Sequence, residues 1–254
     1  MRVRADVVAR LRAAGCVFAE DEADLLLSVA DGLRLDELVA RRVAGLPLEH
    51  VVGFAEFCGR RIAVDPGVFV PRRRTELLVE QAARFLRPGA VVLDLCCGSG
   101  AVAAVLAESD GVEVHAADID PAAVRCARRN VEPRGGRVYE GDLYAPLPPG
   151  LRGRIDVLVV NVPYVPTAEI GMMPPEARLH EPAVALDGGA DGLDLARRVL
   201  AGAGDWLAPR GRLLLETSDE QAGTACALFT AAGLTPSLAR DDDRGAVAVL
   251  GERP

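Results

Sequence analysis

Apolar residues recur at two different periods along the 254-residue chain, and the change of period suggests three parts. Across residues 3–45 they recur at helical spacing between glycines, which predicts three short helices. Across residues 50–71 the apolar runs are short, partly alternating and broken by glycine and Pro-Gly, which predicts a β-hairpin. From residue 75 onward, strand-like and helix-like stretches alternate. The predicted domains are a helical domain over 1–46, a hairpin linker over 47–74 and a larger domain over 75–254.

The larger domain is predicted to be an α/β fold with a seven-stranded, mostly parallel, Rossmann-like sheet. Strands are expected at 90–95, 112–117, 137–142, 154–160, 212–216, 235–240 and 246–251. Helices are expected at 75–86, 99–108, 120–130, 191–207 and from 218 onward, and 161–190 is expected to be a loop. Only "DDDRG" separates the last two strands, which is too short for a crossover, so the last strand should run antiparallel.

Three helix starts carry capping signals. Thr75 precedes an apolar helical pattern and is a candidate N-cap. Asp120 is followed by proline, a frequent first residue of a helix. Ser218 is followed three residues later by Gln221, which predicts a capping box.

Composition narrows the class of protein. The net charge is −8 and the pI is about 5, which disfavours extended contact with nucleic acid. The chain contains no lysine, so lysine-based covalent catalysis is excluded. Its six cysteines lack zinc-site spacing, and no metal site is predicted. Free thiols, no apolar run of membrane length and no signal-peptide pattern predict a cytoplasmic protein with no membrane contact.

A glycine-rich turn follows the strand that holds Asp94. Gly98 and Gly100 mark the change from strand to helix, where backbone N–H groups and the helix dipole bind nucleotide-type ligands. Gly98-x-Gly100-x-x-Ala103, with Asp118 twenty residues on, also fits a dinucleotide fingerprint. A carboxylate at Asp94 would repel a pyrophosphate but attract a cation, which favours S-adenosylmethionine as the cofactor.

Asn161 ends the most hydrophobic strand and is one of only two asparagines in the chain. In open α/β sheets the carboxyl ends of the strands are where ligands bind. The Asn161 side-chain carbonyl and the Val162 backbone carbonyl could together accept both hydrogens of an NH2 group. Pro163 would stiffen the turn, and the ring of Tyr164 could stack on a planar amide or base. This pattern indicates an N-methyltransferase that works by orienting its acceptor.

Ordered motifs from about Pro47 to Gly251 resemble the PrmC/HemK family of protein-(glutamine-N5) methyltransferases. They include "DLCCGSG", "ADIDPAAV", "GDLY", "NVPY" and "LLLETSDEQ". The resemblance implies a class I methyltransferase fold behind a small helical domain that docks a protein substrate. It also implies S-adenosylmethionine as cofactor and, as acceptor, the glutamine of the Gly-Gly-Gln loop of a peptide release factor.

The resemblance also assigns roles by matching position. Asp94, Gly98 and Gly100 would hold the methionine part of the cofactor, Asp118 the ribose, and Asp142 would lie near the adenine. The predicted catalytic set is Asn161, Val162, Pro163 and Tyr164. The predicted cofactor-binding set is Asp94, Cys96, Gly98, Gly100, Asp118, Asp142 and Asn161.

The sequence departs from the family in three respects. Val162 stands where the family has proline, and Arg73-Arg74 stands where the family has Pro-Glu. The helical domain also looks shorter than usual. Three adjacent arginines, Arg72 to Arg74, are expected to form a solvated face.

Three alternatives stay open. The same chemistry could act on another protein, a small-molecule amine or an exocyclic base amine. The glycine turn could serve an NAD-dependent oxidoreductase, or the chain could bind a cofactor without catalysis. The oligomeric state is not indicated, and a monomer is the default expectation.

Overall fold

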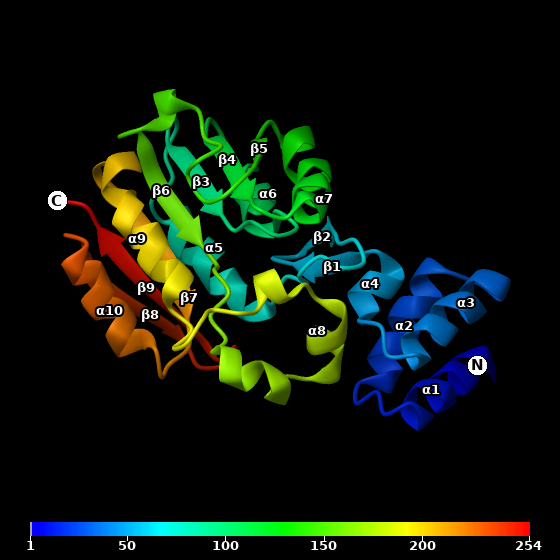
Figure 1. Ribbon diagram of the computed structural model, residues 1–254. Coiled ribbons are helices and arrows are strands. Elements are labelled where there is room, and N and C mark those ends of the chain that lie inside the picture. Colours follow the sequence, from blue (N-terminus) through cyan, green and yellow to red (C-terminus); the bar gives the residue numbers. More distant parts are fainter. Residues whose placement is uncertain (1) are drawn as a thin grey trace.

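The computed structural model describes residues 2–254, and only Met1, the first residue of the predicted helical domain, lies outside this range. A small helical bundle at the N-terminus lies beside a larger α/β unit (Figure 1). The bundle consists of α1 (Arg2–Ala13), α2 (Ala19–Val29), α3 (Gly32–Val43) and α4 (Leu48–Val52). The first three helices confirm the prediction. The short α4 was not expected, but its Val51 packs in the same apolar cluster as Leu11, Leu26 and Leu38.

The predicted hairpin is present but shorter than expected. Strands β1 (Phe54–Phe57) and β2 (Arg60–Ala63) pair antiparallel, with Phe57 opposite Arg60. Cys58 and Gly59 form the two-residue loop, and both have positive φ angles of 48° and 70°. Such a loop matches the right-handed twist of paired strands. Figure 1 shows the hairpin between the helical bundle and the large sheet.

The large sheet has seven strands, as predicted, in the order β5-β4-β3-β6-β7-β9-β8. The strands are β3 (Val91–Leu95), β4 (Glu113–Asp118), β5 (Arg137–Glu140), β6 (Ile155–Val160), β7 (Leu207–Thr217), β8 (Thr235–Asp241) and β9 (Ala246–Glu252). Strands β3 to β7 are parallel, and β9 lies antiparallel between β7 and β8. The antiparallel last strand is therefore confirmed.

Helices cover both faces of this sheet (Figure 1). The helices are α5 (Glu76–Ala83), α6 (Ala101–Leu106), α7 (Pro121–Val131), α9 (Asp194–Trp206) and α10 (Ala222–Ala231), with short 3-10 turns η1 (Arg73–Thr75), η2 (Glu132–Arg134) and η3 (Pro149–Leu151). Helices α5, α6 and α7 share one apolar cluster with Val92, while α9 and α10 share another with Leu93. Successive residues of β3 therefore face opposite layers, which is why the central strands are apolar throughout.

Of the three capping predictions, only that for Asp120 is confirmed in full. The Asp120 carboxylate accepts the N–H of Ala122 at 2.8 Å. Ser218 and Gln221 exchange the expected hydrogen bonds of 3.3 and 3.4 Å, but these lie in the turn before the helix, because α10 begins at Ala222 and its N-cap residue, Gln221, makes no side-chain cap bond. The Thr75 prediction is wrong, because its backbone is already helical within η1 and its side chain makes no cap bond. Its hydroxyl is used at the functional site instead.

Residues 161–190 were expected to be a loop, and this is only partly correct. They contain η4 (Thr167–Met172), α8 (Pro175–His180) and η5 (Ala183–Ala185). This stretch contains five prolines, which were interpreted as loop signals. Proline is also common in the first turn of a helix, so these short helices could not be recognised from the sequence. Glu176 of α8 pairs with Arg42 of the helical bundle at 2.7 Å, so this segment contacts both parts of the molecule.

Candidate active site

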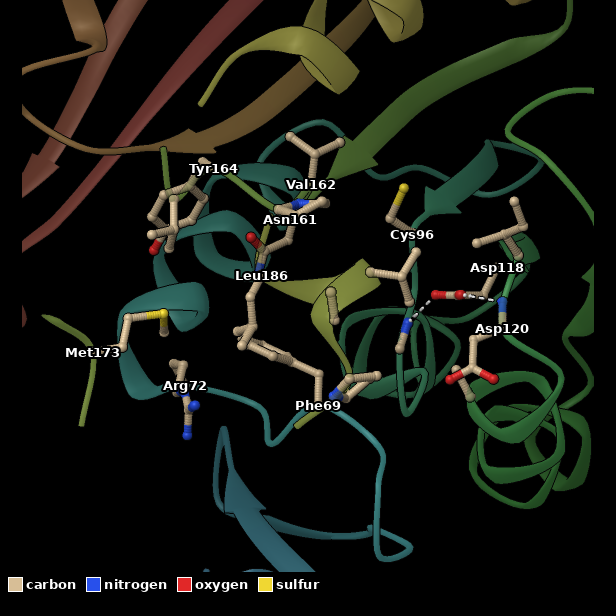
Figure 2. A pocket seen from close by; sticks show the side chains of 18 of the residues that line it. Phe69, Arg72, Cys96, Asp118, Asp120, Asn161, Val162, Tyr164, Met173 and Leu186 are labelled. Carbon is tan, nitrogen blue, oxygen red and sulfur yellow. Dashed lines mark hydrogen bonds between the residues drawn. The ribbon is translucent and has the colours of Figure 1, made fainter. Parts of the chain in front are cut away.

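The carboxyl ends of β3, β4 and β6 bring the predicted site residues to one edge of the sheet. Asp94 pairs in register with Ala116 of β4 and with Val159 of β6. A cavity of about 760 Å³, including its open mouth, lies at this edge. Its lining includes the predicted residues Cys96, Gly98, Asp118, Asn161, Val162, Pro163 and Tyr164 (Figure 2).

A smaller cavity of about 390 Å³ adjoins the first. Phe69, Cys96, Gly98 and Asn161 line both cavities, and Asp94 lines the smaller one. The glycine turn and the end of β6 therefore face a shared space. A two-part ligand that spans the turn and reaches Asn161 would fit this arrangement.

The Asp94 side chain is a buried carboxylate without a cationic partner. Its exposed fraction is 2%, and its Oδ2 accepts the N–H of Ala103 at 3.0 Å. No arginine or histidine of residues 2–254 forms an ion pair with it. Burial raises the pKa of Asp94 to about 7; the nearby Asp118 charge also raises it, and the Ala103 hydrogen bond opposes the shift. A cation beside Asp94 would relieve this cost.

Asp118 shapes the glycine turn from the neighbouring strand. Its Oδ2 accepts the N–H of Gly98 at 2.8 Å, and its Oδ1 accepts the N–H of Asp120 at 2.9 Å (Figure 2). Burial raises the pKa of Asp118, and these backbone hydrogen bonds oppose the shift. Because each carboxylate oxygen can accept a further hydrogen bond, Asp118 can hold the turn and a ligand hydroxyl together.

The two glycines of the turn have different roles. A Cβ built on Gly98 meets no atom within 4 Å, and Gly98 lines both cavities, so its missing side chain leaves space for a ligand. A Cβ on Gly100 would lie 2.8 Å from Val131 and 3.0 Å from Ala127 of α7. Gly100 lines neither cavity. It therefore allows α6 and α7 to pack closely, and a contact between Gly100 and the cofactor stays a prediction.

Two other predicted cofactor residues differ in their surroundings. Cys96 has a positive φ of 57° and lines both cavities, and burial raises the pKa of its thiol. It is thus a neutral, compact wall residue. Asp142 lines neither cavity, and its Oδ2 accepts a hydrogen bond of 2.6 Å from Arg198. Its proximity to an adenine stays a prediction.

The end of β6 offers two unused acceptors. Asn161 Nδ2 donates to Thr75 Oγ1 at 3.3 Å, which leaves Asn161 Oδ1 toward the cavity. Within residues 2–254, neither this oxygen nor the Val162 carbonyl accepts a hydrogen bond. Val162 itself is 2% exposed and packs into the core of the sheet. Tyr164 donates its hydroxyl to Glu216 Oε1 at 3.2 Å, and burial raises the pKa of the tyrosine.

Several residues of the site were not predicted. Arg72 and Arg74 line the cavity while their side chains stay 33% and 43% exposed, so the arginine face is solvated as expected and also forms part of the site wall. Arg72 pairs with Glu181, and Arg74 Nε lies 3.2 Å from Glu216 Oε1. Other wall residues that were not predicted are Phe69, Ile119 and Leu186. Met173 also lines the cavity (Figure 2).

Two kinds of feature are absent from residues 2–254. No helix there is both long and apolar enough to cross a bilayer. No group of three or more histidine, cysteine or acidic side chains there is arranged to hold a metal ion.

The sheet order, the single antiparallel strand and the glycine turn between strand-end acids define a class I methyltransferase fold. Residues 59–177 match the family described as Methyltransferase small domain. The methyltransferase from Pyrococcus furiosus has a similar structure, with a TM-score of 0.57 and 19% identity over 84% of this chain and 96% of that one.

Relatives with higher sequence identity show which family the chain belongs to. The release factor glutamine methyltransferase of Geobacter sulfurreducens is 40% identical over 219 residues, which cover 85% of this chain and 76% of that protein. This chain belongs to the family of release factor glutamine methyltransferases. A further relative, the 4-amino-L-phenylalanine/4-methylamino-L-phenylalanine methyltransferase of Streptomyces pristinaespiralis, is 38% identical over 231 residues, 88% of this chain and 78% of that protein. The methyltransferase prediction is confirmed, and the oxidoreductase alternative gains no support.

Proposed function

We propose that this enzyme uses S-adenosylmethionine to methylate the side-chain nitrogen of a glutamine, with the Gly-Gly-Gln loop of a peptide release factor as its protein partner. The observation that carries the proposal is the pair of unused acceptors, Asn161 Oδ1 and the Val162 carbonyl, beside a cavity that the glycine turn also lines. Because translation termination is cytoplasmic, the proposal implies a cytoplasmic enzyme.

The residues around the turn fit this cofactor. Asp94 is buried without a positive partner, which suits an amino group and a sulfonium nearby. Gly98 leaves room for close approach, and Asp118 can accept hydrogen bonds from ribose hydroxyls. When bound, S-adenosylmethionine supplies a methyl group on a positively charged sulfur. The chain supplies the cavity and the charge that would hold it.

Orientation is the main contribution of Asn161 and Val162. An amide nitrogen is a weak nucleophile because its lone pair is delocalised into the carbonyl. If both of its N–H groups donate to Asn161 Oδ1 and the Val162 carbonyl, the nitrogen is held in one direction. The same two oxygens stabilise the positive charge that develops on nitrogen during transfer. No strong base is needed, because the proton can leave after the methyl group has been transferred.

The N-terminal bundle is proposed to dock the protein substrate. It exposes the apolar side chains of Val17, Phe18 and Leu33, with exposed fractions of 84%, 68% and 90%. Phe18 also lines a groove that continues along the hairpin to Arg72 and Arg73, beside the mouth of the active-site cavity. A partner bound along this groove would present a loop toward Asn161.

A small aromatic amine is the second candidate acceptor. One relative is named for 4-amino-L-phenylalanine. The cavity wall contains Phe69, Tyr164 and Leu186, which can enclose an aromatic ring. Arg74 uses only its Nε in the described structure, so its other N–H groups are free to bind a carboxylate.

Both candidates are tested by mass spectrometry with Asn161→Ala as the control variant. The enzyme and S-adenosylmethionine are incubated with an unmethylated class I release factor and, separately, with 4-amino-L-phenylalanine. One methyl on the Gly-Gly-Gln glutamine, lost in the variant, supports the first proposal. Methyl transfer to the free amine alone supports the second. Transfer to neither, with calorimetry showing that cofactor binds, contradicts both acceptors.

A further inference from the structure

Glu216 lies directly behind the acceptor side of the cavity. Val160 of β6 pairs with Leu215 of β7, so Asn161 and Glu216 follow at the ends of two adjacent parallel strands. Glu216 is 3% exposed and lines neither cavity, so it does not reach an acceptor directly. Its side chain instead contacts residues that do line the site.

Two side chains donate to the same oxygen of Glu216. Tyr164 Oη lies 3.2 Å from Glu216 Oε1, and Arg74 Nε lies 3.2 Å from this oxygen as well. The Arg74 guanidinium is also 5.3 Å from the centre of the Tyr164 ring. The other oxygen, Oε2, is buried and has no hydrogen-bond partner among residues 2–254. A buried acceptor of this kind is costly unless a donor turns toward it.

Thr75 lies between Glu216 and Asn161. Burial raises the pKa of Glu216, while the nearby Thr75 hydroxyl and the charge of Arg74 lower it, and the unpaired Glu216 Oε2 is the acceptor toward which the Thr75 proton can turn. Thr75 Oγ1 also lies 3.3 Å from Asn161 Nδ2. An ionised carboxylate only accepts hydrogen bonds, whereas a hydroxyl has one proton to donate. If the Thr75 proton is turned to Glu216, its oxygen can only accept, and Asn161 must present its NH2 group to it.

The direction of the hydrogen bond between Asn161 and Thr75 decides which end of the Asn161 amide faces the cavity. With its NH2 group toward Thr75, the carbonyl oxygen faces the acceptor and can receive an N–H. A flipped amide would place its own N–H groups against those of the acceptor, and neither could accept. The direction of the hydrogen bonds behind the site therefore controls whether the site can hold an amino or amide nitrogen.

We propose that Glu216 is a positioning residue for methyl transfer: through the Thr75 hydroxyl it holds the Asn161 amide with its carbonyl oxygen toward the acceptor. The inference rests on the proposed function, because it concerns how the same acceptor is oriented. Arg74, which stands where the family has an acid, lies 3.2 Å from this carboxylate, and its positive charge lowers the pKa of Glu216 against the effect of burial.

The first test measures methyl transfer by Glu216→Gln, which keeps the shape of the side chain but can donate to Thr75 and so reverse the polarity. We expect kcat/KM for the acceptor to fall roughly 10- to 100-fold, because a misdirected amide loses the aligned geometry. The cofactor Kd from calorimetry should change by less than threefold. Asp156→Asn is the matched control, an acid-to-amide change at the opposite end of β6 whose carboxylate pairs with Arg87.

A pH profile separates positioning from mere stabilisation. In Arg74→Gln the carboxylate of Glu216 loses its positive partner, so its pKa rises. The acidic limb of the kcat/KM profile should therefore move to higher pH. A residue that only stabilises the fold would lower the melting temperature without moving this limb.

Nuclear magnetic resonance tests the inference without any acceptor, so its failure is distinct from a failure of the proposed function. Selective labelling of asparagine with ¹⁵N gives only two side-chain amides, from Asn130 and Asn161. Asn130 is an internal reference, because its Nδ2 donates to Ala63 and Ser99 carbonyls away from Glu216. We expect the Asn161 signals to shift in Glu216→Gln and in Thr75→Val while those of Asn130 stay in place. Unchanged Asn161 signals in both folded variants, or an unchanged kcat/KM in Glu216→Gln, would overturn the proposal.

Discussion

Arg72 and Glu181 meet across 109 residues of sequence, with Arg72 Nη2 lying 2.6 and 2.7 Å from the two carboxylate oxygens of Glu181. The Glu181 side chain is 1% exposed and also accepts the N–H of Val70 at 3.2 Å. This pair joins the chain that follows the hairpin to the 161–190 segment, and both segments line the active-site cavity. It therefore closes one wall of the site.

Replacing Glu181 with glutamine should loosen that wall. The Val70 hydrogen bond can survive, but the charge pair is lost, so we expect unfolding to become easier by about 1–3 kcal/mol. Limited proteolysis within 161–190 should become faster, because the segment is less well held. Asp205→Asn is the control, since its pairing with Arg152 is largely exposed. Identical digestion of Glu181→Gln and wild type would contradict this role.

The two glycines of the turn give opposite predictions. Gly100→Ala should destabilise the fold by about 2–5 kcal/mol, because the methyl group meets α7 at a positive φ of 75°. Gly98→Ala should cost only about 1–2 kcal/mol for its φ of 55°, but should weaken cofactor binding by filling the cavity wall. Urea unfolding and calorimetric titration separate the two effects. If Gly98→Ala were the less stable variant and bound cofactor normally, both assignments would be wrong.

Asp94 predicts an unusual pH dependence of stability. Its pKa of about 7 in the folded chain exceeds the unfolded value of 3.8, so between these values the native state binds a proton that the unfolded state lacks. Stability from this group is therefore full below the unfolded pKa and is lost as pH rises through 7. From pH 5 to pH 8 the free energy of unfolding should fall by about 3 kcal/mol more in wild type than in Asp94→Asn.

Urea titrations of the cofactor-free protein at several pH values test this directly. The Asp94→Asn variant keeps a side-chain oxygen for the Ala103 N–H while removing the titration, which makes it a close control. Parallel stability curves for the two proteins would contradict the buried, unpaired state of the carboxylate. Added S-adenosylmethionine should reduce the difference, because a cation beside Asp94 lowers its pKa.

The sequence was sufficient for the sheet and for the residues that end its strands. Asp94, Asp118 and Asn161 each follow or close an apolar strand, and parallel strands bring such ends to one edge. The order of strands and helices was therefore enough to predict that these three residues lie close together. The glycine turn was also visible, but a glycine pattern does not reveal whether a ligand or a neighbouring helix needs the space. The close approach of α7 to Gly100, which its missing Cβ allows, was therefore not predicted.

The walls of the site could not be predicted in the same way. Arg74 meets Glu216 across 142 residues, and no local period records such a pair. The run of three arginines is solvated as expected, but charge alone does not show that Arg72 and Arg74 also line the cavity. Thr75 looked like a helix cap, but the preceding 3-10 turn extends the helical backbone and frees its hydroxyl for Asn161. Each of these cases concerns a tertiary contact that overrides a local preference.

The last prediction concerns Val162, which stands where the family motif has proline. Within residues 2–254 its N–H donates no hydrogen bond, so proline would remove none. Asn161, the residue before it, directly follows strand β6, and a residue before proline favours extended backbone. We therefore expect Val162→Pro to fold, with a free energy of unfolding within about 1 kcal/mol of wild type.

The rate should respond differently from the stability. Proline fixes the backbone and hence the direction of the residue-162 carbonyl, so methyl transfer should rise by roughly 2- to 10-fold without a change in cofactor affinity. Val162→Ala is the control, because it removes buried methyl groups and leaves the turn flexible; it should lower stability and not raise the rate. Activity only in Val162→Pro would mean that the natural site is degenerate. A lower rate in Val162→Pro, with intact folding and cofactor binding, would mean that this site needs the freedom that valine leaves, and that its acceptor is not held as the family motif holds glutamine.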